Sequence, residues 1–252
     1  MNACRILVSG CSGRLGAALV KLAADNENVR VVGGVDRVGG GDIPVFASFA
    51  EVNVEADVIV DMSHHALIGD LLDYATSKRI PAVICTTGHT EEEDERIREA
   101  SRQIPILKSR NMSLGINVMM ELVRRAAAAL GDGFDIEVVE AHHNKKLDAP
   151  SGTALMLADA AKEIREDAEY VYDRASVRRE RDKKEIGIHS VRGGTIVGEH
   201  SVIFAGHDEI ITLSHSAGSR ELFAAGAIKA ATFVKDSAPG FYTMSDVIAS
   251  LM

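Results

Sequence analysis

A glycine-rich turn between an apolar run and a helical pattern constrains the fold of this chain more than any other feature. The apolar run is residues 5–9, and a helix is predicted for residues 15–24. The turn consists of Gly10, Cys11, Ser12, Gly13, Arg14, Leu15 and Gly16. Glycines permit a tight turn, and the helix start that follows presents N–H groups and partial positive charge to a pyrophosphate. The turn therefore predicts a dinucleotide site, although such turns also occur without ligands.

Alternating strand and helix patterns continue to about residue 111 and predict a parallel sheet. Further strands are expected at residues 29–35, 56–61, 82–86 and 104–108. A helix is expected from Thr90 to Ser101, because Thr90 is a typical N-cap and three glutamates follow it. Strands joined by helices form a sheet that is covered on both faces. We expect a Rossmann-like, doubly wound α/β domain.

The pattern changes near residue 112 and predicts a second, α+β domain with a mixed open sheet. Helices are expected at residues 113–130 and 151–164, and strands at 135–140, 185–191, 202–205 and 209–215. Two more helices, 220–235 and 245–251, close the chain. We expect residues 1–111 and 220–252 to form the dinucleotide-binding domain and 112–219 the substrate-binding domain. The charged stretch 174–184 is interpreted as a solvated loop.

An acidic and a basic residue end the second predicted strand. Asp36 stands 20 residues after Gly16, where an acidic side chain usually binds the adenosine ribose. Arg37 follows it, and a guanidinium there suits a 2′-phosphate or stacks on adenine. Asp36 favours NADH and Arg37 tolerates or favours NADPH, so we expect the protein to use both cofactors.

Three loops follow later strands of the predicted parallel sheet, at the edge where such sheets bind ligands. Two of them are placed to meet the nicotinamide and its ribose, and they contain Cys85, Thr86 and Thr87, and Ser109, Arg110, Asn111 and Met112. The third loop contains His64 and His65, but no metal-ligand spacing accompanies them. We expect a satisfied or exposed histidine pair there, and no metal site.

The run from Glu140 to Leu155 combines basic, acidic and small residues in a way that neither a core strand nor a surface helix needs. Its basic residues are His142, His143, Lys145 and Lys146. Histidine exchanges protons near neutral pH, and lysine donates a proton or holds an anion. Ser151 is an N-cap type, and the helix start that it forms with Gly152 and Thr153 suits a carboxylate. The run predicts proton transfer on an acidic substrate; the alternative is a basic loop that precedes a helix.

Charge and cysteine content narrow the class of protein. A net charge of −9 argues against binding to a nucleic-acid backbone. The three cysteines lie in no metal-type spacing and are expected to be free thiols in a reducing cytoplasm. No apolar stretch approaches the roughly 20 residues of a membrane span, and Met1 leads into a strand pattern without a signal peptide. We expect a soluble cytoplasmic protein with no nucleic-acid or membrane partner.

The segment from His142 to Ala154 resembles the HHxxKxDAPSGTA signature of the dihydrodipicolinate reductase family, the 4-hydroxy-tetrahydrodipicolinate reductases. This signature is long and specific, and the resemblance extends over essentially the whole chain. It includes the glycine turn, Thr86-Thr87-Gly88, residues 111–117, residues 186–194, Gly198-Glu199-His200, Arg220 with Phe223, and residues 239–242.

The resemblance implies NAD(P)H-dependent reduction of a cyclic dicarboxylate imine, with loss of water, in the diaminopimelate route to lysine. It implies that His142 donates or accepts a proton, that Lys146 is a second donor, and that His143 contacts the substrate. Gly152 and Thr153 would hold a substrate carboxylate. The cofactor residues that it implies are Gly10–Leu15, Asp36, Arg37, Cys85–Thr87 and Ser109–Met112. Members of the family are typically homotetramers joined through the sheets of the second domain.

The chain departs from the family pattern at three of these positions. Cys85 stands where glycine is frequent, Arg110 where a small residue is usual, and Met112 where an aromatic residue is frequent. Met112 weakens the expectation of stacking on the nicotinamide, although its side chain can still pack on the ring. A diaminopimelate or diaminopentanoate dehydrogenase would explain the N-terminal half but not the signature. A redox-sensing protein that binds NAD(H) without turnover is the alternative outside the enzymes.

Overall fold

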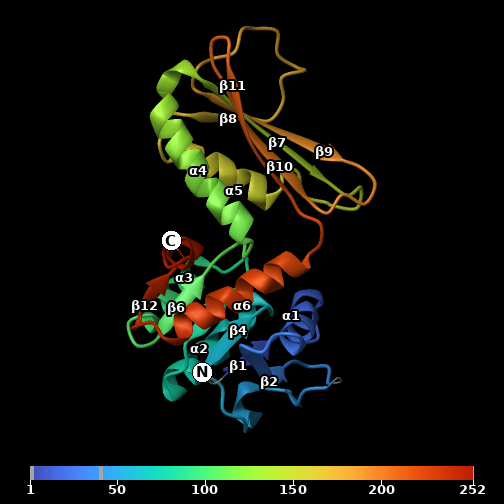
Figure 1. Ribbon diagram of the computed structural model, residues 1–252, viewed down its shortest axis with the longest axis vertical. Helices are drawn as coiled ribbons and strands as arrows, with labels where there is room; N and C mark the ends of the chain where they lie inside the picture. Colours follow the sequence, from blue (N-terminus) through green and yellow to red (C-terminus); the bar gives the residue numbers. More distant parts are fainter. Residues whose placement is uncertain (1–2, 40–41, 252) are drawn as a thin grey trace. The chain divides into compact units, whose positions relative to one another are not determined.

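The computed structural model describes residues 3–39 and 42–251 and divides the chain into two compact units (Figure 1). Unit 1 consists of Met1–Leu114 and Arg220–Met252, and unit 2 of Gly115–Ser219. Met1, on which the expected absence of a signal peptide rests, lies outside the described residues. No helix in the described part of the chain is long and apolar enough to cross a membrane.

Unit 1 is built on a parallel sheet of seven strands in the order β12-β6-β5-β4-β1-β2-β3. In that order the strands span Gly240–Tyr242, Pro105–Lys108, Ala82–Ile84, Val58–Asp61, Cys4–Ser9, Val29–Val35 and Val45–Phe46. The central strands are mainly apolar, as expected of strands whose two faces are both buried. This sheet confirms the predicted doubly wound α/β fold.

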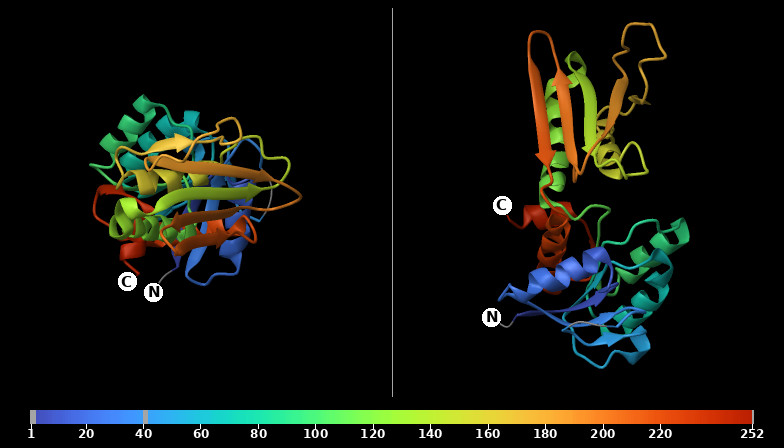
Figure 2. Two further views of the ribbon diagram at one scale, coloured as in Figure 1. Left: turned by 90° about the horizontal axis from the view of Figure 1, so that it is seen from above. Right: turned by 90° about the vertical axis from the view of Figure 1, so that its right-hand side faces the viewer.

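Helices cover both faces of this sheet, as the right-hand view of Figure 2 shows. One face packs against α1 (Arg14–Ala24), α6 (Glu221–Lys235) and α7 (Met244–Ala249), and the other against α2 (Ile68–Lys78) and α3 (Glu91–Ala100). Side chains alternate between the two layers along β1: Ile6 and Val8 face the first, and Leu7 faces the second. Short 3₁₀ helices lie at Phe49–Glu51 and His65–Leu67.

The predicted N-cap of α3 is confirmed. Thr90 accepts a hydrogen bond from Glu93 N, and the Glu93 carboxylate accepts one from Thr90 N. This reciprocal pair satisfies two of the N–H groups that a helix start leaves without partners. It fixes the end of the loop that carries Thr86 and Thr87.

Unit 2 is built on a mixed sheet of five strands in the order β11-β10-β7-β9-β8. In that order the strands span Ile210–Ser216, Glu199–Ala205, Asp135–His142, Glu185–Arg192 and Glu169–Val171. Strands β7, β10 and β11 pair antiparallel, whereas β7–β9 and β8–β9 are parallel pairs. Helices α4 (Leu114–Leu130) and α5 (Gly152–Lys162) pack against one face, and a 3₁₀ turn spans Gly131–Gly133. The predicted mixed α+β unit is confirmed.

Strand β7 is two residues longer than predicted and ends at His142, because His142 pairs with Arg192 of β9. Alternate side chains of a strand share a face, so Glu140 and His142 follow Ile136 and Val138 on the face that α5 covers. The extension therefore places a carboxylate and an imidazole side by side at the carboxyl end of this strand.

The charged stretch 174–184 contains neither helix nor strand, and most of its side chains are exposed. Arg174 and Arg181 are half-buried exceptions, and the guanidinium of Arg181 binds the carboxylates of Asp135 and Glu137. Arg174 also donates to Glu137. The loop is thus solvated along most of its length but attached to the beginning of β7.

Candidate active site

The imidazole of His142 and the carboxylate of Glu140 form a buried pair at the carboxyl end of β7. His142 Nδ1 lies 2.6 Å from Glu140 Oε2. The side chain of Glu140 is 0% exposed and that of His142 is 11% exposed. Nε2, the other ring nitrogen of His142, has no hydrogen-bond partner among the described residues. The ring is therefore held through Nδ1 and presents Nε2.

Arg192 supplies the counter-charge for Glu140. Its Nη1 donates to Glu140 Oε2 at 2.8 Å, and its Nη2 donates to Oε1 at 2.7 Å. The backbone N–H of Ser151 adds a bond of 3.2 Å to Oε1. Burial alone would raise the pKa of Glu140, but hydrogen bonds from Arg192, His142 and Ser190 outweigh burial and lower the pKa to about 2. Glu140 is therefore an anion at neutral pH.

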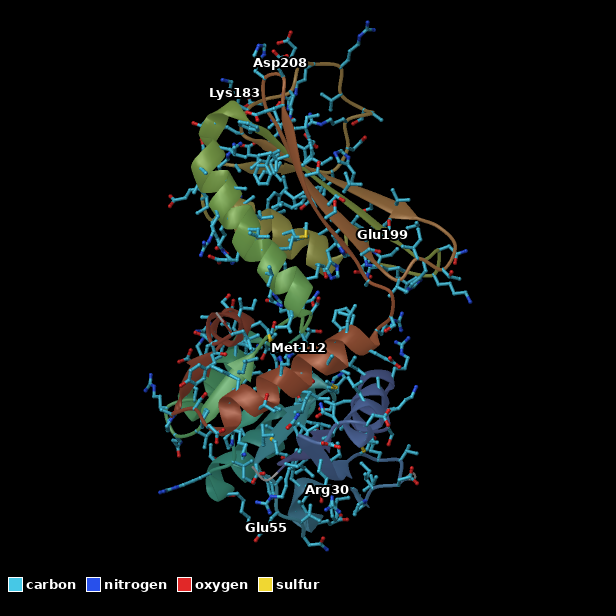
Figure 3. The ribbon with its side chains drawn as sticks, viewed as in Figure 1. Arg30, Glu55, Met112, Lys183, Glu199 and Asp208 are labelled. Atoms are coloured by element: carbon cyan, nitrogen blue, oxygen red, sulfur yellow. The ribbon has the colours of Figure 1, made fainter. Side chains whose placement is uncertain are left out.

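His200 packs beside this pair from β10, the strand that begins at Glu199 in Figure 3. Its ring lies edge-on to the ring of His142, with centroids 5.1 Å apart, and its Nε2 lies 3.0 Å from Ser151 Oγ. Burial, followed by the nearby His142, lowers the pKa of His200 to about 4. His200 is therefore neutral at pH 7.

The beginning of α5 forms the second part of the site. Ser151 caps the helix as predicted, since its Oγ accepts a hydrogen bond from Ala154 N. Gly152 is exposed, and a Cβ added there would meet nothing within 4 Å. Thr153 follows it in the first turn and is half-buried. A helix of eleven residues with open space at its start can receive a carboxylate.

Lys146 lies in the loop between β7 and α5. Its Nζ is 2.9 Å from Asp148 Oδ1, and this contact lowers the pKa of Asp148. Arg192 Nη2 donates to the carbonyl oxygen of Asp148 at 2.7 Å. Of the predicted site residues in unit 2, His142 and Ser151 thus contact Glu140 directly, and Lys146 is linked to Arg192 through Asp148. His143 is half-buried, and Lys145 is exposed in the same loop.

The glycine turn of unit 1 has the geometry that a pyrophosphate needs. Gly10 has a φ of +78°, and a Cβ at Gly16 would lie 2.1 Å from Gly10 O. Gly13 is the N-cap of α1 and supplies no side-chain cap, so the first N–H groups of the helix are left to a ligand. Arg14 is exposed, Leu15 is half-buried and Cys11 is buried against Gly34.

Asp36 lies beside this turn, as its sequence position predicts. Its Oδ2 accepts a hydrogen bond of 2.9 Å from Ser12 N, and its Oδ1 accepts one of 2.7 Å from Arg37 N. The carboxylate is therefore fixed at the end of β2, where it could receive ribose hydroxyls. Arg37 is exposed at the same end.

The other two predicted cofactor loops follow β5 and β6 at the same edge of the sheet. Thr86 is 7% exposed, and its Oγ1 is buried without a hydrogen-bond partner in the described residues. A buried hydroxyl without a partner is unusual and suits a site that a ligand completes. Thr87 is exposed, and burial raises the pKa of the adjacent Cys85 thiol. These residues fit a nicotinamide nucleotide.

The loop after β6 is shaped by its own side chains. Ser109 Oγ donates to Asn111 O, and Ser113 N donates to Asn111 Oδ1. Arg110 is exposed, whereas Met112, labelled in Figure 3, belongs to the apolar core of unit 1. The methionine side chain is therefore committed to packing within that core.

The two histidines that follow β4 have partners within the protein. His65 Nδ1 lies 3.0 Å from Glu93 Oε2, and His64 Nδ1 accepts from Ala66 N. Within residues 3–39 and 42–251, no group of three His, Cys, Asp or Glu side chains is arranged to hold a metal ion.

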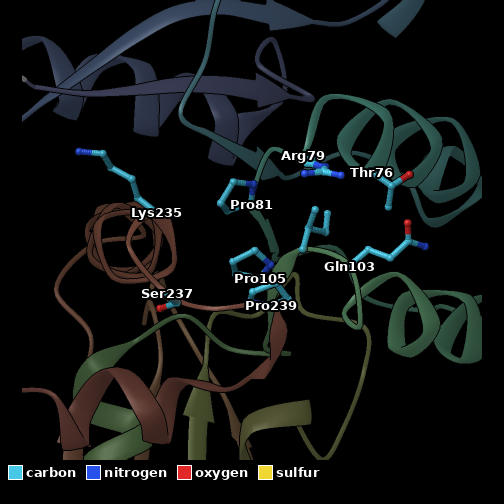
Figure 4. Close-up of a pocket in the computed structure, with 9 residues that line it drawn as sticks. Thr76, Arg79, Pro81, Gln103, Pro105, Lys235, Ser237 and Pro239 are labelled. Atoms are coloured by element: carbon cyan, nitrogen blue, oxygen red, sulfur yellow. The ribbon is translucent and has the colours of Figure 1, made fainter.

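A pocket of about 520 Å³ in unit 1 lies away from all of these residues. It opens at the amino ends of β5, β6 and β12, beside Pro81, Pro105 and Pro239 (Figure 4). Arg79 and Lys235 also line it. Since parallel sheets of this kind bind ligands at the carboxyl ends of their strands, the pocket lies at the opposite edge from the glycine turn.

Sequence reasoning missed three members of the site in unit 2. Glu140 was noted only as the start of the run, and Arg192 and His200 were noted only within longer matching segments. Arg192 and His200 come from β9 and β10, so only the pairing of these strands with β7 brings them to Glu140. The available signal was the spacing of Glu140 and His142, which places both on one face of a strand.

Comparison with known proteins identifies the family of the chain. Residues 4–112 match the family "Dihydrodipicolinate reductase, N-terminus", and residues 115–248 match "Dihydrodipicolinate reductase, C-terminus". The chain is 54% identical over 246 residues to the 4-hydroxy-tetrahydrodipicolinate reductase of Caldanaerobacter subterraneus subsp. tengcongensis, covering 97% of this chain and 98% of the relative. It is 45% identical to the enzyme of that name from Clostridium tetani, covering 98% and 97%.

The fold is also similar to a solved structure, a dipicolinate-bound dihydrodipicolinate reductase from Paenisporosarcina sp. TG-14. The TM-score is 0.82 and the sequence identity 24%, with 96% of this chain and 97% of that chain covered. The sequence matches span both units, and they include the signature that had suggested the family. The chain belongs to the dihydrodipicolinate reductase family.

Proposed function

We propose that this protein reduces 4-hydroxy-tetrahydrodipicolinate to tetrahydrodipicolinate, with loss of water, in the diaminopimelate route to L-lysine. The observation that carries the proposal is the buried pair of Glu140 and His142 beside the open start of α5. Membership of the family over nearly the whole chain supports the same reaction. The bound NADH or NADPH supplies the hydride.

His142 is the proposed proton donor. Hydride addition to a ring double bond that is conjugated with the imine leaves an electron pair on a ring carbon. That carbon then needs a proton. His142 Nε2 faces away from Glu140 and is the nitrogen that can deliver this proton. Lys146 is the proposed second donor, because its ammonium lies in the same loop at the end of β7.

The start of α5 is the proposed site for a substrate carboxylate. Gly152 and Thr153 offer first-turn N–H groups and the positive end of the helix dipole, while Ser151 shapes the helix start. His143 is proposed to contact the substrate from the preceding loop. A dicarboxylate needs cationic and N–H partners, and this end of unit 2 offers both kinds.

The proposed cofactor site in unit 1 contains the glycine turn, Asp36, Arg37 and the two loops after β5 and β6. Replacing Arg37 by alanine should weaken NADPH binding by about tenfold, the effect of one lost charged hydrogen bond, and NADH binding by less. Dissociation constants for both nucleotides, measured from the fluorescence of the reduced nicotinamide, would check this. The chain contains no tryptophan whose fluorescence would interfere. Equal weakening of both would mean that Arg37 only stacks on adenine.

We also propose a homotetramer in the cytoplasm. The sheet of unit 2 has α4 and α5 on one face only, and on its other face the side chains of Val191 and Ile210 are 49% and 68% exposed. A sheet face that no described helix covers, and that carries exposed apolar residues among its polar ones, can pack against another copy of the chain. Free cysteines support a reducing compartment. Sedimentation equilibrium of the protein would test the tetramer, and a monomer at micromolar concentration would contradict it.

Steady-state kinetics with enzymatically generated substrate, run with NADH and NADPH in parallel, tests the proposed reaction. We expect oxidation of the nicotinamide only when the cyclic imine is present. Turnover of meso-diaminopimelate instead would identify the protein as a dehydrogenase and would contradict the proposal.

A further inference from the structure

A single carboxylate, that of Glu140, is connected to each part of the proposed site in unit 2. It contacts His142 at 2.6 Å and the N–H of Ser151, where α5 begins, at 3.2 Å. Its partner Arg192 also donates to the carbonyl oxygen of Asp148, whose side chain binds Lys146. Both proposed proton donors and the carboxylate-binding helix start are therefore linked through Glu140 and Arg192.

On the basis of the proposed function, we infer that Glu140 and Arg192 are a positioning pair. They hold His142, Lys146 and the start of α5 in the geometry that the reaction requires. Glu140 is fully buried, so no substrate atom reaches its carboxylate. Its effect on the reaction passes through the groups that it binds.

The pair also determines which nitrogen of His142 carries the proton in the neutral ring. A carboxylate that is ionised and already bound to Arg192 only accepts hydrogen bonds, so Nδ1 must be the donor toward Glu140. Nε2 is then the site where a proton arrives and leaves. The anion next to Nδ1 also stabilises the imidazolium that exists before the proton is delivered.

The space around Nε2 is restricted by the neighbouring strand. A Cβ added at Gly198, just before β10, would lie 3.1 Å from His142 Nε2. Glycine at this position therefore leaves room beside the nitrogen that exchanges the proton. Glu140 fixes the ring from one side, and the absence of a side chain at Gly198 keeps the other side open.

A matched control for Glu140 lies on the same strand. Glu137 also binds a histidine and an arginine, since Glu137 Oε2 is 2.7 Å from His189 Nε2 and Oε1 is 2.9 Å from Arg181 Nε. It faces the side of the sheet that α5 does not cover. Glu140→Gln and Glu137→Gln therefore remove the same charge from similar partners in two places.

The test compares kcat, KM and the pH dependence of kcat for the full-length wild type and these two variants. We expect Glu140→Gln to lower kcat by about 100-fold, the scale of an impaired general acid, and to raise KM by a smaller factor, because Glu140 also holds the start of α5. The descending limb of kcat against pH should move to lower pH, because the imidazolium loses its anion. Glu137→Gln should keep wild-type kcat within about twofold and the wild-type pH profile.

Equal effects of the two variants, or a Glu140→Gln variant with an unchanged pH profile, would overturn the inference. If Glu140→Gln does not fold, nitrogen NMR of the histidine-labelled wild type replaces it, at a pH where the ring of His142 is neutral. The proton is expected on Nδ1, and a proton on Nε2 would overturn the inference. A wild type that does not reduce the imine would instead refute the proposed function, which keeps the two failures distinct.

Discussion

Each face of strand β7 contributes a glutamate to a group of one glutamate, one histidine and one arginine. The two groups consist of Glu140, His142 and Arg192, here the site group, and of Glu137, His189 and Arg181, here the outer group. Glu140 is 0% exposed, whereas Glu137 is 21% exposed. The outer group lies toward the Asp135 end of β7, and the site group lies at the His142 end.

The difference shows that the neighbours of such a group decide what it can do. The site group contacts the start of α5 and the loop of Lys146. The outer group contacts the charged loop 174–184, because Arg181 belongs to that loop and Arg174 joins it on Glu137. One group can hold a reacting ring in place, while the other attaches a loop to the sheet.

The largest expected effect contrasts the two histidines. His142→Ala should lower kcat by about 1000-fold, within the range for a lost general acid, and leave the dissociation constant of NADH unchanged. His189→Ala removes the equivalent ring of the outer group and should change kcat by less than about twofold. Steady-state kinetics and nucleotide titration of both variants measure this contrast. A similar kcat for the two variants would remove the distinction between the groups.

The next effect contrasts the two arginines through stability. Arg192→Met leaves the fully buried Glu140 without its cation and should lower the free energy of unfolding by about 3 kcal/mol. Arg181→Met should cost about half of that value, because Glu137 keeps Arg174 and is partly exposed to water. Urea unfolding of both variants at pH 7 provides the comparison. A larger loss for Arg181→Met would contradict the difference in burial.

The smallest expected effect is the pH dependence that His200 adds beside the site group. Its folded-state pKa of about 4 lies below the ordinary value of 6.5. Between these values the unfolded chain takes up a proton that the folded chain does not, so stability falls as the pH falls through this window. The loss from this group should reach about 2 kcal/mol at pH 5, since each unit of pKa difference is worth about 1.4 kcal/mol.

The His200→Gln variant lacks this titrating group, so comparing it with the wild type tests the prediction. As the pH falls from 7 to 5, the unfolding free energy of the wild type should fall by about 2 kcal/mol more than that of the variant, because only the wild type takes up this extra proton on unfolding. Parallel curves across this range would show that His200 is protonated equally in both states.

The parts of the fold that follow from local pattern could be predicted from the sequence. The glycine turn, the apolar strands and the Thr90 and Ser151 caps each depend on residues within a few positions of one another. The short strands β3, β8 and β12 could not be predicted: unlike the short β5, which lies in an apolar run, each is defined only by the strand it pairs with.

The same distinction applies to the site. His142, Lys146 and Ser151 lie in one continuous run, so composition alone could identify them as candidates. Arg192 and His200 lie 52 and 60 residues after Glu140 in the chain and reach it only through strand register. The role of Glu140 could not be predicted for the same reason, since Arg192 and His200 come from other strands.

A stoichiometric reaction tests the central claim, that this protein reduces the cyclic imine, most directly. The purified wild type is mixed with one equivalent of reduced nicotinamide nucleotide and an excess of freshly generated 4-hydroxy-tetrahydrodipicolinate, and products are followed by mass spectrometry. We predict one tetrahydrodipicolinate formed for each nucleotide oxidised. A nucleotide that binds but stays reduced in the presence of the imine would contradict the claim and would indicate a protein that only senses NAD(H).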